Sequence, residues 1–233
     1  MNSNIIILEL EFEYENIKHI IKPVLLRDKN NIILVDCGYE ETITILLKKL
    51  EELGIKGEEI DILYLTHQDD DHMGAAFELK RRYPNIKIMT SEVEAKYING
   101  KAKNLRLIQG EKFLELLPLE QKEFGNKFCE RMKKIKKVNV DKVCRIGDIF
   151  EWCGGCEVID TKGHTPGHTS LYLQKQKILI VGDAAVVEKN DLMVANPQFC
   201  LDIKESEKTI ERIKKLNVKK YICYHGENLE NSL

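Results

Sequence analysis

The sequence has no hydrophobic run long enough to cross a membrane. Such a helix needs about 18 or more consecutive apolar residues, and the uninterrupted apolar stretches of this 233-residue chain are much shorter. The N-terminus, Met-Asn-Ser-Asn-Ile-Ile-Ile-Leu, also lacks the basic segment and the small-residue cleavage site of a secretory signal. These absences predict a soluble cytoplasmic protein without a membrane partner, whose first residues form a strand.

The chain also has no excess of charge of one sign. It contains 36 Lys and Arg against 38 Asp and Glu, for a formal net charge of −2. This balance disfavours nucleic acid as a partner, because polyanions are usually bound by a basic excess. The most basic stretch, Arg131 to Lys137, has apolar residues at helical spacing and is interpreted as a solvated helix face, with a binding patch as the alternative. We expect a small-molecule substrate and leave a homodimer open.

The seven cysteines lack the even number of a closed disulfide framework. Without an export signal, free thiols in a reducing cytoplasm are the simpler interpretation. Cys153-Gly-Gly-Cys156 has the spacing of redox and zinc sites, but no second Cys pair accompanies it. Two glycines between strand-like runs are typical of a tight turn, so a turn is predicted, with redox or zinc chemistry as the alternative.

Apolar periodicity predicts an alternation of strands and helices within a single domain, residues 1–233. Strands are expected at 4–12, 20–27, 31–36, 60–65, 86–89, 142–145, 157–160, 169–174, 177–182 and 219–224, and helices at 41–53, 73–83, from Ser91 and at 203–216. Residues 97–140 carry Leu and Phe at helical intervals and are predicted to be a helical insert that could form a lid. Two mixed sheets packed together with outer helices, an αβ/βα sandwich of the α/β class, satisfy this order.

Five of the six histidines lie in polar clusters that follow or flank predicted strands. His67-Gln68-Asp69-Asp70-Asp71-His72 places nitrogen and oxygen ligands in one loop, although a loop rich in Asp is the ordinary alternative. Gly163-His164-Thr165-Pro166-Gly167-His168 forms a second cluster, and Gly182-Asp183 and Tyr224-His225-Gly226 end two further strands. Together these clusters predict a metal site.

In this order the motifs resemble those of the metallo-β-lactamase superfamily, over most of the chain. Val35-Asp36-Cys37-Gly38 also matches the early Asp-x-Gly turn of that family, whose Asp supports the metal loops. The resemblance implies a four-layered αβ/βα sandwich with two divalent metal ions, most often zinc, with iron or manganese as alternatives. It implies a first metal bound by His67, Asp69 and His164, and a second bound by Asp71, His72 and His225, with Asp183 as the bridge.

The sequence departs from this family at Asp69, where the usual motif has His. A carboxylate is a harder ligand than imidazole, which shifts the preference toward iron or manganese. Its negative charge would also lower the Lewis acidity of the site. Alternatively, Asp69 coordinates poorly and the first site is weak or empty.

The resemblance implies a hydrolase. Two ions would lower the pKa of a bridging water from nearly 16 toward about 7. The resulting hydroxide would attack an ester, thioester, lactone or similar carbonyl, with Asp71 or a metal-bound water protonating the leaving group. His168 would donate a hydrogen bond, with a structural role as the alternative.

Two other functions stay open at this point, a mononuclear iron oxidoreductase such as a sulfur dioxygenase and a metal-binding scaffold without activity. An RNA phosphodiesterase is disfavoured by the balanced charge. Substrate specificity is expected to reside in residues 97–140 and in the loop Ala195 to Phe199, but these residues do not identify the substrate.

Overall fold

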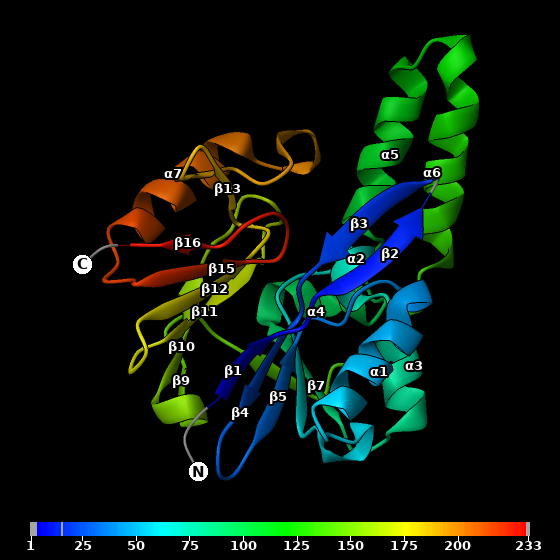
Figure 1. Cartoon of the computed structure of the whole chain (residues 1–233). Coiled ribbons are helices and arrows are strands. Elements are labelled where there is room, and N and C mark those ends of the chain that lie inside the picture. The colour runs from blue at the N-terminus through cyan, green and yellow to red at the C-terminus, as the bar shows by residue number, and fades with distance from the viewer. Residues whose placement is uncertain (1–3, 15, 232–233) are drawn as a thin grey trace.

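The computed structural model of the chain describes residues 4–14 and 16–231 (Figure 1). Its first six-stranded sheet has the order β1 (Asn4–Ile7), β4 (Val24–Arg27), β5 (Ile32–Val35), β6 (Ile62–Leu65), β7 (Lys87–Ser91), β8 (Lys142–Cys144). Strands β5 to β8 run parallel, whereas β1, β4 and β5 pair in antiparallel fashion. The sheet is therefore mixed, and the parallel strands bring their carboxyl ends to one edge.

The second six-stranded sheet has the order β16 (Leu229–Glu230), β15 (Lys220–Cys223), β12 (Ile178–Gly182), β11 (Thr169–Leu173), β10 (Cys156–Asp160), β9 (Ile149–Phe150). Only the β12 and β15 pair is parallel among the pairings in this described sheet. Two short hairpins complete the β-structure, β2 (Leu10–Tyr14) with β3 (Ile17–Ile21), and β13 (Val186–Glu188) with β14 (Asp191–Met193).

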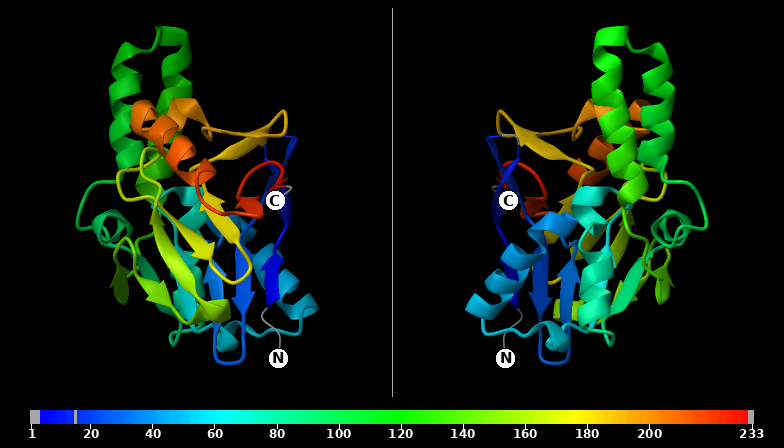
Figure 2. Two further views of the ribbon diagram at one scale, coloured as in Figure 1. Left: turned by 90° about the vertical axis from the view of Figure 1, so that its left-hand side faces the viewer. Right: turned by 90° about the vertical axis from the view of Figure 1, so that its right-hand side faces the viewer.

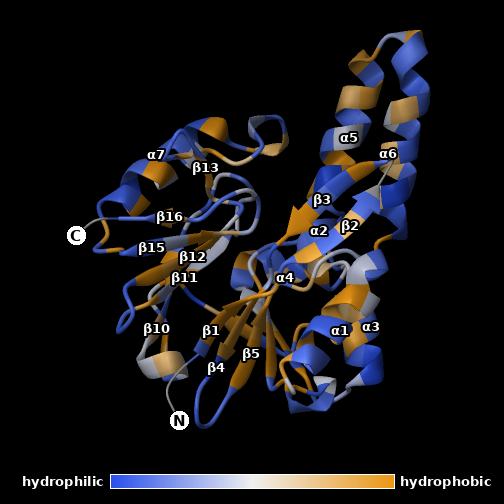
Figure 3. Ribbon diagram, in the orientation of Figure 1, coloured by the Kyte–Doolittle hydropathy of each residue, from blue (hydrophilic) through white to orange (hydrophobic). Residues whose placement is uncertain are grey.

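Helices cover the outer faces of both sheets, which gives four layers (Figure 1). Helices α1 (Ile43–Glu52) and α3 (Ala76–Arg82) lie against the first sheet, and α7 (Ile203–Lys214) lies against the second. Successive strand residues point to opposite faces. Leu34 accordingly belongs to a buried cluster with Leu46 of α1, whereas its neighbour Ile33 belongs to one with Leu171 of the second sheet. The apolar strands between more polar helices are visible in Figure 3, and the predicted αβ/βα sandwich is confirmed.

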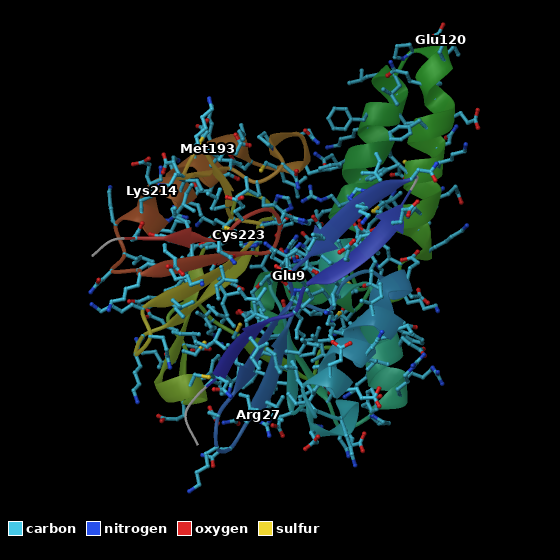
Figure 4. The ribbon with its side chains drawn as sticks, in the orientation of Figure 1. Glu9, Arg27, Glu120, Met193, Lys214 and Cys223 are labelled. Carbon is cyan, nitrogen blue, oxygen red and sulfur yellow. The ribbon has the colours of Figure 1, made fainter. Side chains whose placement is uncertain are left out.

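A helical insert projects beyond the sheets, as both side views show (Figure 2). After α4 (Glu92–Ile98), the chain forms the antiparallel pair α5 (Leu105–Leu116) and α6 (Lys122–Lys134). Buried Leu107, Cys129 and Met132 hold the pair together near its base. Glu120, between the two helices, lies at the far end of the insert (Figure 4). The prediction of one or two helices within residues 97–140 agrees with this arrangement.

Several predicted elements are divided in the structure. The strand expected at 4–12 consists of β1 and β2, and the one at 20–27 consists of β3 and β4, with Pro23 between them, because proline cannot donate a ladder hydrogen bond. The helix expected at 73–83 is replaced by α2 (Asp70–Met73) and α3. Gly74 separates these helices, where a Cβ atom would lie 2.7 Å from the backbone nitrogen of Glu40. The close approach of two backbone segments thus requires glycine at position 74.

The turn predicted at Cys153-Gly-Gly-Cys156 is present between the antiparallel strands β9 and β10. Gly154 and Gly155 have φ angles of +87° and +115°, which side chains rarely permit. Within residues 4–14 and 16–231, no helix combines the length and the apolar character that a membrane span requires.

Candidate metal centre

The loops that follow the strands meet at one edge of the two sheets and bring together all seven side chains predicted to bind metal. The segment after β6, a short loop followed by α2, supplies four of them, and single residues come from the β10–β11 loop and from the ends of β12 and β15. They form a first cluster of His67, Asp69 and His164, and a second cluster of Asp71, His72, Asp183 and His225. In each cluster the potential ligand atoms lie within 4.8 Å of one another.

The second cluster has the donor set and the geometry of a metal site. Nε2 of His72 lies 3.2 Å from Oδ1 of Asp183, yet within the described residues neither of these buried atoms has a hydrogen-bond partner. Nε2 of His225 lies 3.0 Å from Oδ2 of Asp71 and 3.4 Å from Oδ1 of Asp183. Leaving buried polar atoms without partners is costly. Two imidazoles and two carboxylates facing a common point therefore fit a divalent ion.

Asp36 orients the second cluster from behind. Its Oδ2 lies 2.8 Å from Nδ1 of His72, and its two oxygens accept hydrogen bonds from the backbone N–H and the hydroxyl of Thr66. A carboxylate at Nδ1 keeps the proton on that nitrogen and leaves the lone pair of Nε2 toward the cluster. This agrees with the supporting role that the early Asp-x-Gly turn implies.

The first cluster already holds a cation that the sequence analysis did not find, the guanidinium of Arg106 on α5. Nε and Nη2 of Arg106 lie 2.8 Å and 2.7 Å from Oδ2 of Asp69, and Nη2 lies 2.8 Å from Nε2 of His164. Burial alone would raise the pKa of Asp69, but the charges of Arg106 and His67 hold it well below its usual value. The guanidinium contacts the ligand atoms of two of the three residues in this cluster, Asp69 and His164. The first cluster therefore does not fit a metal ion as the second one does.

Asp183 stands between the clusters. Its Oδ1 faces the second cluster, while its Oδ2 lies 3.5 Å from Nε2 of His164 in the first. Burial favours the neutral form, but His225 and His72 hold the pKa of Asp183 well below its usual range. The position matches the bridging role that the family resemblance implies.

Glu94 of α4 connects the two histidine loops, a role that its sequence context did not reveal. Its carboxylate accepts hydrogen bonds from the backbone N–H groups of Gln68 and Gly167 and from the hydroxyl of Thr165. Complete burial raises the pKa of Glu94 to about 7, although these hydrogen bonds oppose the rise. Glu94 thus fixes the loop of the first motif to the loop that carries His164.

His168 belongs to neither cluster. Its two ring nitrogens bear on the prediction that it donates a hydrogen bond to the substrate. Its Nε2 accepts a hydrogen bond of 3.0 Å from the backbone N–H of Asp183, and its Nδ1 lies 2.9 Å from the hydroxyl of Thr161. Both ring nitrogens are therefore used within the protein, and an accepting Nε2 carries no proton to donate. The geometry favours the structural alternative, in which His168 positions Asp183.

A cavity of about 410 Å³ lies over the two clusters. The helical insert contributes Arg106, Phe128 and Arg131 to its lining, and the loop at residues 195–199 contributes Asn196 and Phe199. The rings of Phe128 and Phe199 stack with their centroids 6.4 Å apart. Both segments expected to set specificity therefore border the site.

This fold and donor set belong to a known class. The chain is a member of the metallo-β-lactamase superfamily, whose Lactamase_B model matches residues 20–225. It is a hydrolase of that fold, in agreement with the prediction.

Individual relatives share 20% to 30% of their residues with this chain. The probable metallo-hydrolase MJ0888 of Methanocaldococcus jannaschii is 30% identical over 211 residues, which cover 87% of this chain and 86% of the relative. The hydroxyacylglutathione hydrolase GloC of Haemophilus influenzae is 27% identical over 157 residues, covering 67% of this chain and 62% of that protein. A solved metallo-β-lactamase family protein from Thermus thermophilus has a TM-score of 0.74 at 20% identity, covering 97% of this chain and 74% of that one.

Proposed function

We propose that the protein uses a divalent metal ion to hydrolyse an ester, thioester, lactone or similar carbonyl bond in a small molecule. The observation that carries this proposal is the second cluster. There, Nε2 of His72 and Oδ1 of Asp183 form no hydrogen bond within the described part of the chain and face each other beneath the cavity. The cavity volume of about 410 Å³ falls within the range usual for small-molecule sites. The name of the relative GloC, a hydroxyacylglutathione hydrolase, favours thioesters among these bonds.

The residues of the second cluster would hold the ion, and we propose zinc because mixed imidazole and carboxylate ligands suit it, with iron or manganese as alternatives. A bound divalent ion lowers the pKa of water and polarises a carbonyl oxygen. Asp71 lines the cavity, and the charges of His72 and His225 overcome the effect of its burial and hold its pKa below the usual range. Ionised Asp71 can orient the attacking water by accepting a hydrogen bond from it, and the proton of that water would pass to the leaving group.

We also propose a cytoplasmic location, which the seven free cysteines support.

The test begins with the metal content of the purified protein. The loaded protein is then assayed with aryl esters, with acyl thioesters by thiol release, and with lactones by acid release. We expect turnover of at least one class, its loss on chelation and its return when zinc is added. A loaded, folded protein that hydrolyses none of these substrates would contradict the proposal.

A further inference from the structure

The guanidinium of Arg106 lies among the ligand atoms of the first cluster. Arg106 is the second residue of α5, and only 3% of its surface is exposed. Its Nη2 lies 2.7 Å from Oδ2 of Asp69 and 2.8 Å from Nε2 of His164. These two atoms are potential metal ligands of the cluster, so the guanidinium lies where a first ion would have to bind.

An arginine in this position and a metal ion exclude each other. The guanidinium is always charged and has no lone pair, so it can only donate hydrogen bonds. Nη2 could donate to Nε2 of His164 only through the lone pair that a metal would need, and a proton on that nitrogen, shared with Oδ2 of Asp69 at 3.0 Å, would exclude a metal as well. A divalent ion beside it would also meet a positive charge in a buried site, where water screens repulsion poorly.

Side-chain and backbone atoms of the insert, of the 195–199 loop and of the metal motif hold the guanidinium in place. Nη1 donates to Oε1 of Gln109 at 3.0 Å and to the backbone oxygen of Phe199. Gln68, from the metal motif itself, accepts a hydrogen bond from the backbone N–H of Leu105 and donates one to Oδ1 of Asp69. The start of α5 is thereby tied to the loop that carries the first cluster.

We propose that Arg106 takes the place of a metal ion in the first cluster, so that the protein binds a single ion, in the second cluster. This inference rests on the proposed function, because it assumes that the second cluster holds metal. It also accounts for the departure from the family motif at Asp69. A His there would leave the buried guanidinium without a carboxylate, whereas Asp69 and Arg106 form a neutral pair.

The test is a titration of metal-free protein with Co²⁺, followed by absorption spectroscopy, and with Zn²⁺, followed by calorimetry. We expect the wild type to bind one equivalent and Arg106→Met to bind two, because Asp69, His67 and His164 become available. Arg131→Met is the matched control. Arg131 lines the same cavity but pairs with Asp70, which belongs to neither cluster, so this variant should bind one equivalent.

Removing Arg106 leaves the Asp69 charge buried, so the single variant could fail to fold, which circular dichroism would reveal. The double variant Asp69→His with Arg106→Met removes that charge and supplies a third imidazole, and it should bind two equivalents. Two equivalents in the wild type, or one in a folded variant without Arg106, would overturn the inference. A wild type that binds no metal would contradict the proposed function itself, whereas two equivalents leave that function intact.

Discussion

The two clusters of the metal centre have similar residues but different surroundings. In the second, Asp36 orients His72, and the buried atoms Nε2 of His72 and Oδ1 of Asp183 face each other without a hydrogen bond among the described residues. In the first, Asp69 and His164 both contact Arg106, and of the described ligand atoms of this cluster only Nε2 of His67, 3.3 Å from Oδ2 of Asp69, makes no hydrogen bond. Ligand residues at the family spacing therefore do not suffice for a metal site. A cation from a distant segment can use the same lone pairs.

The largest effect is expected for Asp183→Ala, since Asp183 faces both clusters. Loss of this carboxylate should abolish tight metal binding and lower turnover by about a thousandfold or more, because a catalytic ion contributes several kcal/mol. Metal analysis after dialysis and the substrate assays measure both. Asp191→Ala removes an exposed carboxylate that pairs with Lys214 and should change neither. Full turnover by the Asp183 variant would show that the second cluster is not the catalytic centre.

A smaller effect is expected for Asp36→Asn. This variant tests whether Asp36, which contacts His72 of the second cluster only, strengthens metal binding there. The amide cannot replace both oxygens that hold His72 and Thr66, so the ring of His72 loses its fixed tautomer and orientation. Metal affinity should fall by about 10- to 100-fold, the usual cost of removing such a contact. Competition with a chromophoric chelator measures the dissociation constant. An unchanged dissociation constant would mean that the contact between Asp36 and His72 does not contribute to metal binding in the second cluster.

Glu94→Gln should change the pH dependence of stability. Burial raises the pKa of Glu94 from 4.5 to about 7, so between these pH values the folded protein holds a proton that the unfolded chain has released. This component of the free energy of unfolding is therefore greatest at acid pH and is lost as pH rises toward 7, by a few kcal/mol at most. Gln does not titrate, so the variant should lack this decline.

Urea unfolding of metal-free wild type and Glu94→Gln at several pH values between 5 and 8 measures the difference. Gln also offers one acceptor oxygen where Glu94 uses two, so one of the loop N–H groups should lose its partner, at a cost of about 1–3 kcal/mol. Parallel stability curves for the two proteins would show that the pKa of Glu94 is not raised.

Polar clusters after predicted strands indicated a metal site, and the resemblance to the metallo-β-lactamase superfamily implied its seven residues. Parallel strands end at a common edge, so residues that directly follow them meet there. Arg106 could not be predicted in this way. It lies in Asn104-Leu-Arg-Leu, an ordinary helix start in which Asn104 caps α5, and its contacts with Asp69 and His164 depend on how the insert packs.

The role of Glu94 could not be predicted from the sequence either, although the helix that contains it was predicted correctly. Ser91 does cap α4, and its hydroxyl accepts a hydrogen bond from the backbone N–H of Glu94. In a capping box formed by Ser91 and Glu94, the Glu94 carboxylate would point back to the helix start. It instead bonds to the loops of His67 and His164. Local pattern predicted the helix, but tertiary contacts decided the role of the side chain.

The smallest effect is expected for His67→Asn, and it compares the clusters directly. His67 contacts Thr66 through Nδ1, and an Asn side chain can keep that contact while removing Nε2 from the first cluster. If Arg106 excludes metal from that cluster, the variant should still bind one equivalent, with a dissociation constant within about threefold of the wild type, less than the loss of a supporting contact would cause. The same replacement at His72 removes a ligand of the second cluster and should abolish tight binding. An equal loss of metal binding in the His67 and His72 variants would mean that both clusters hold metal. Arg106 would then not exclude an ion from the first cluster.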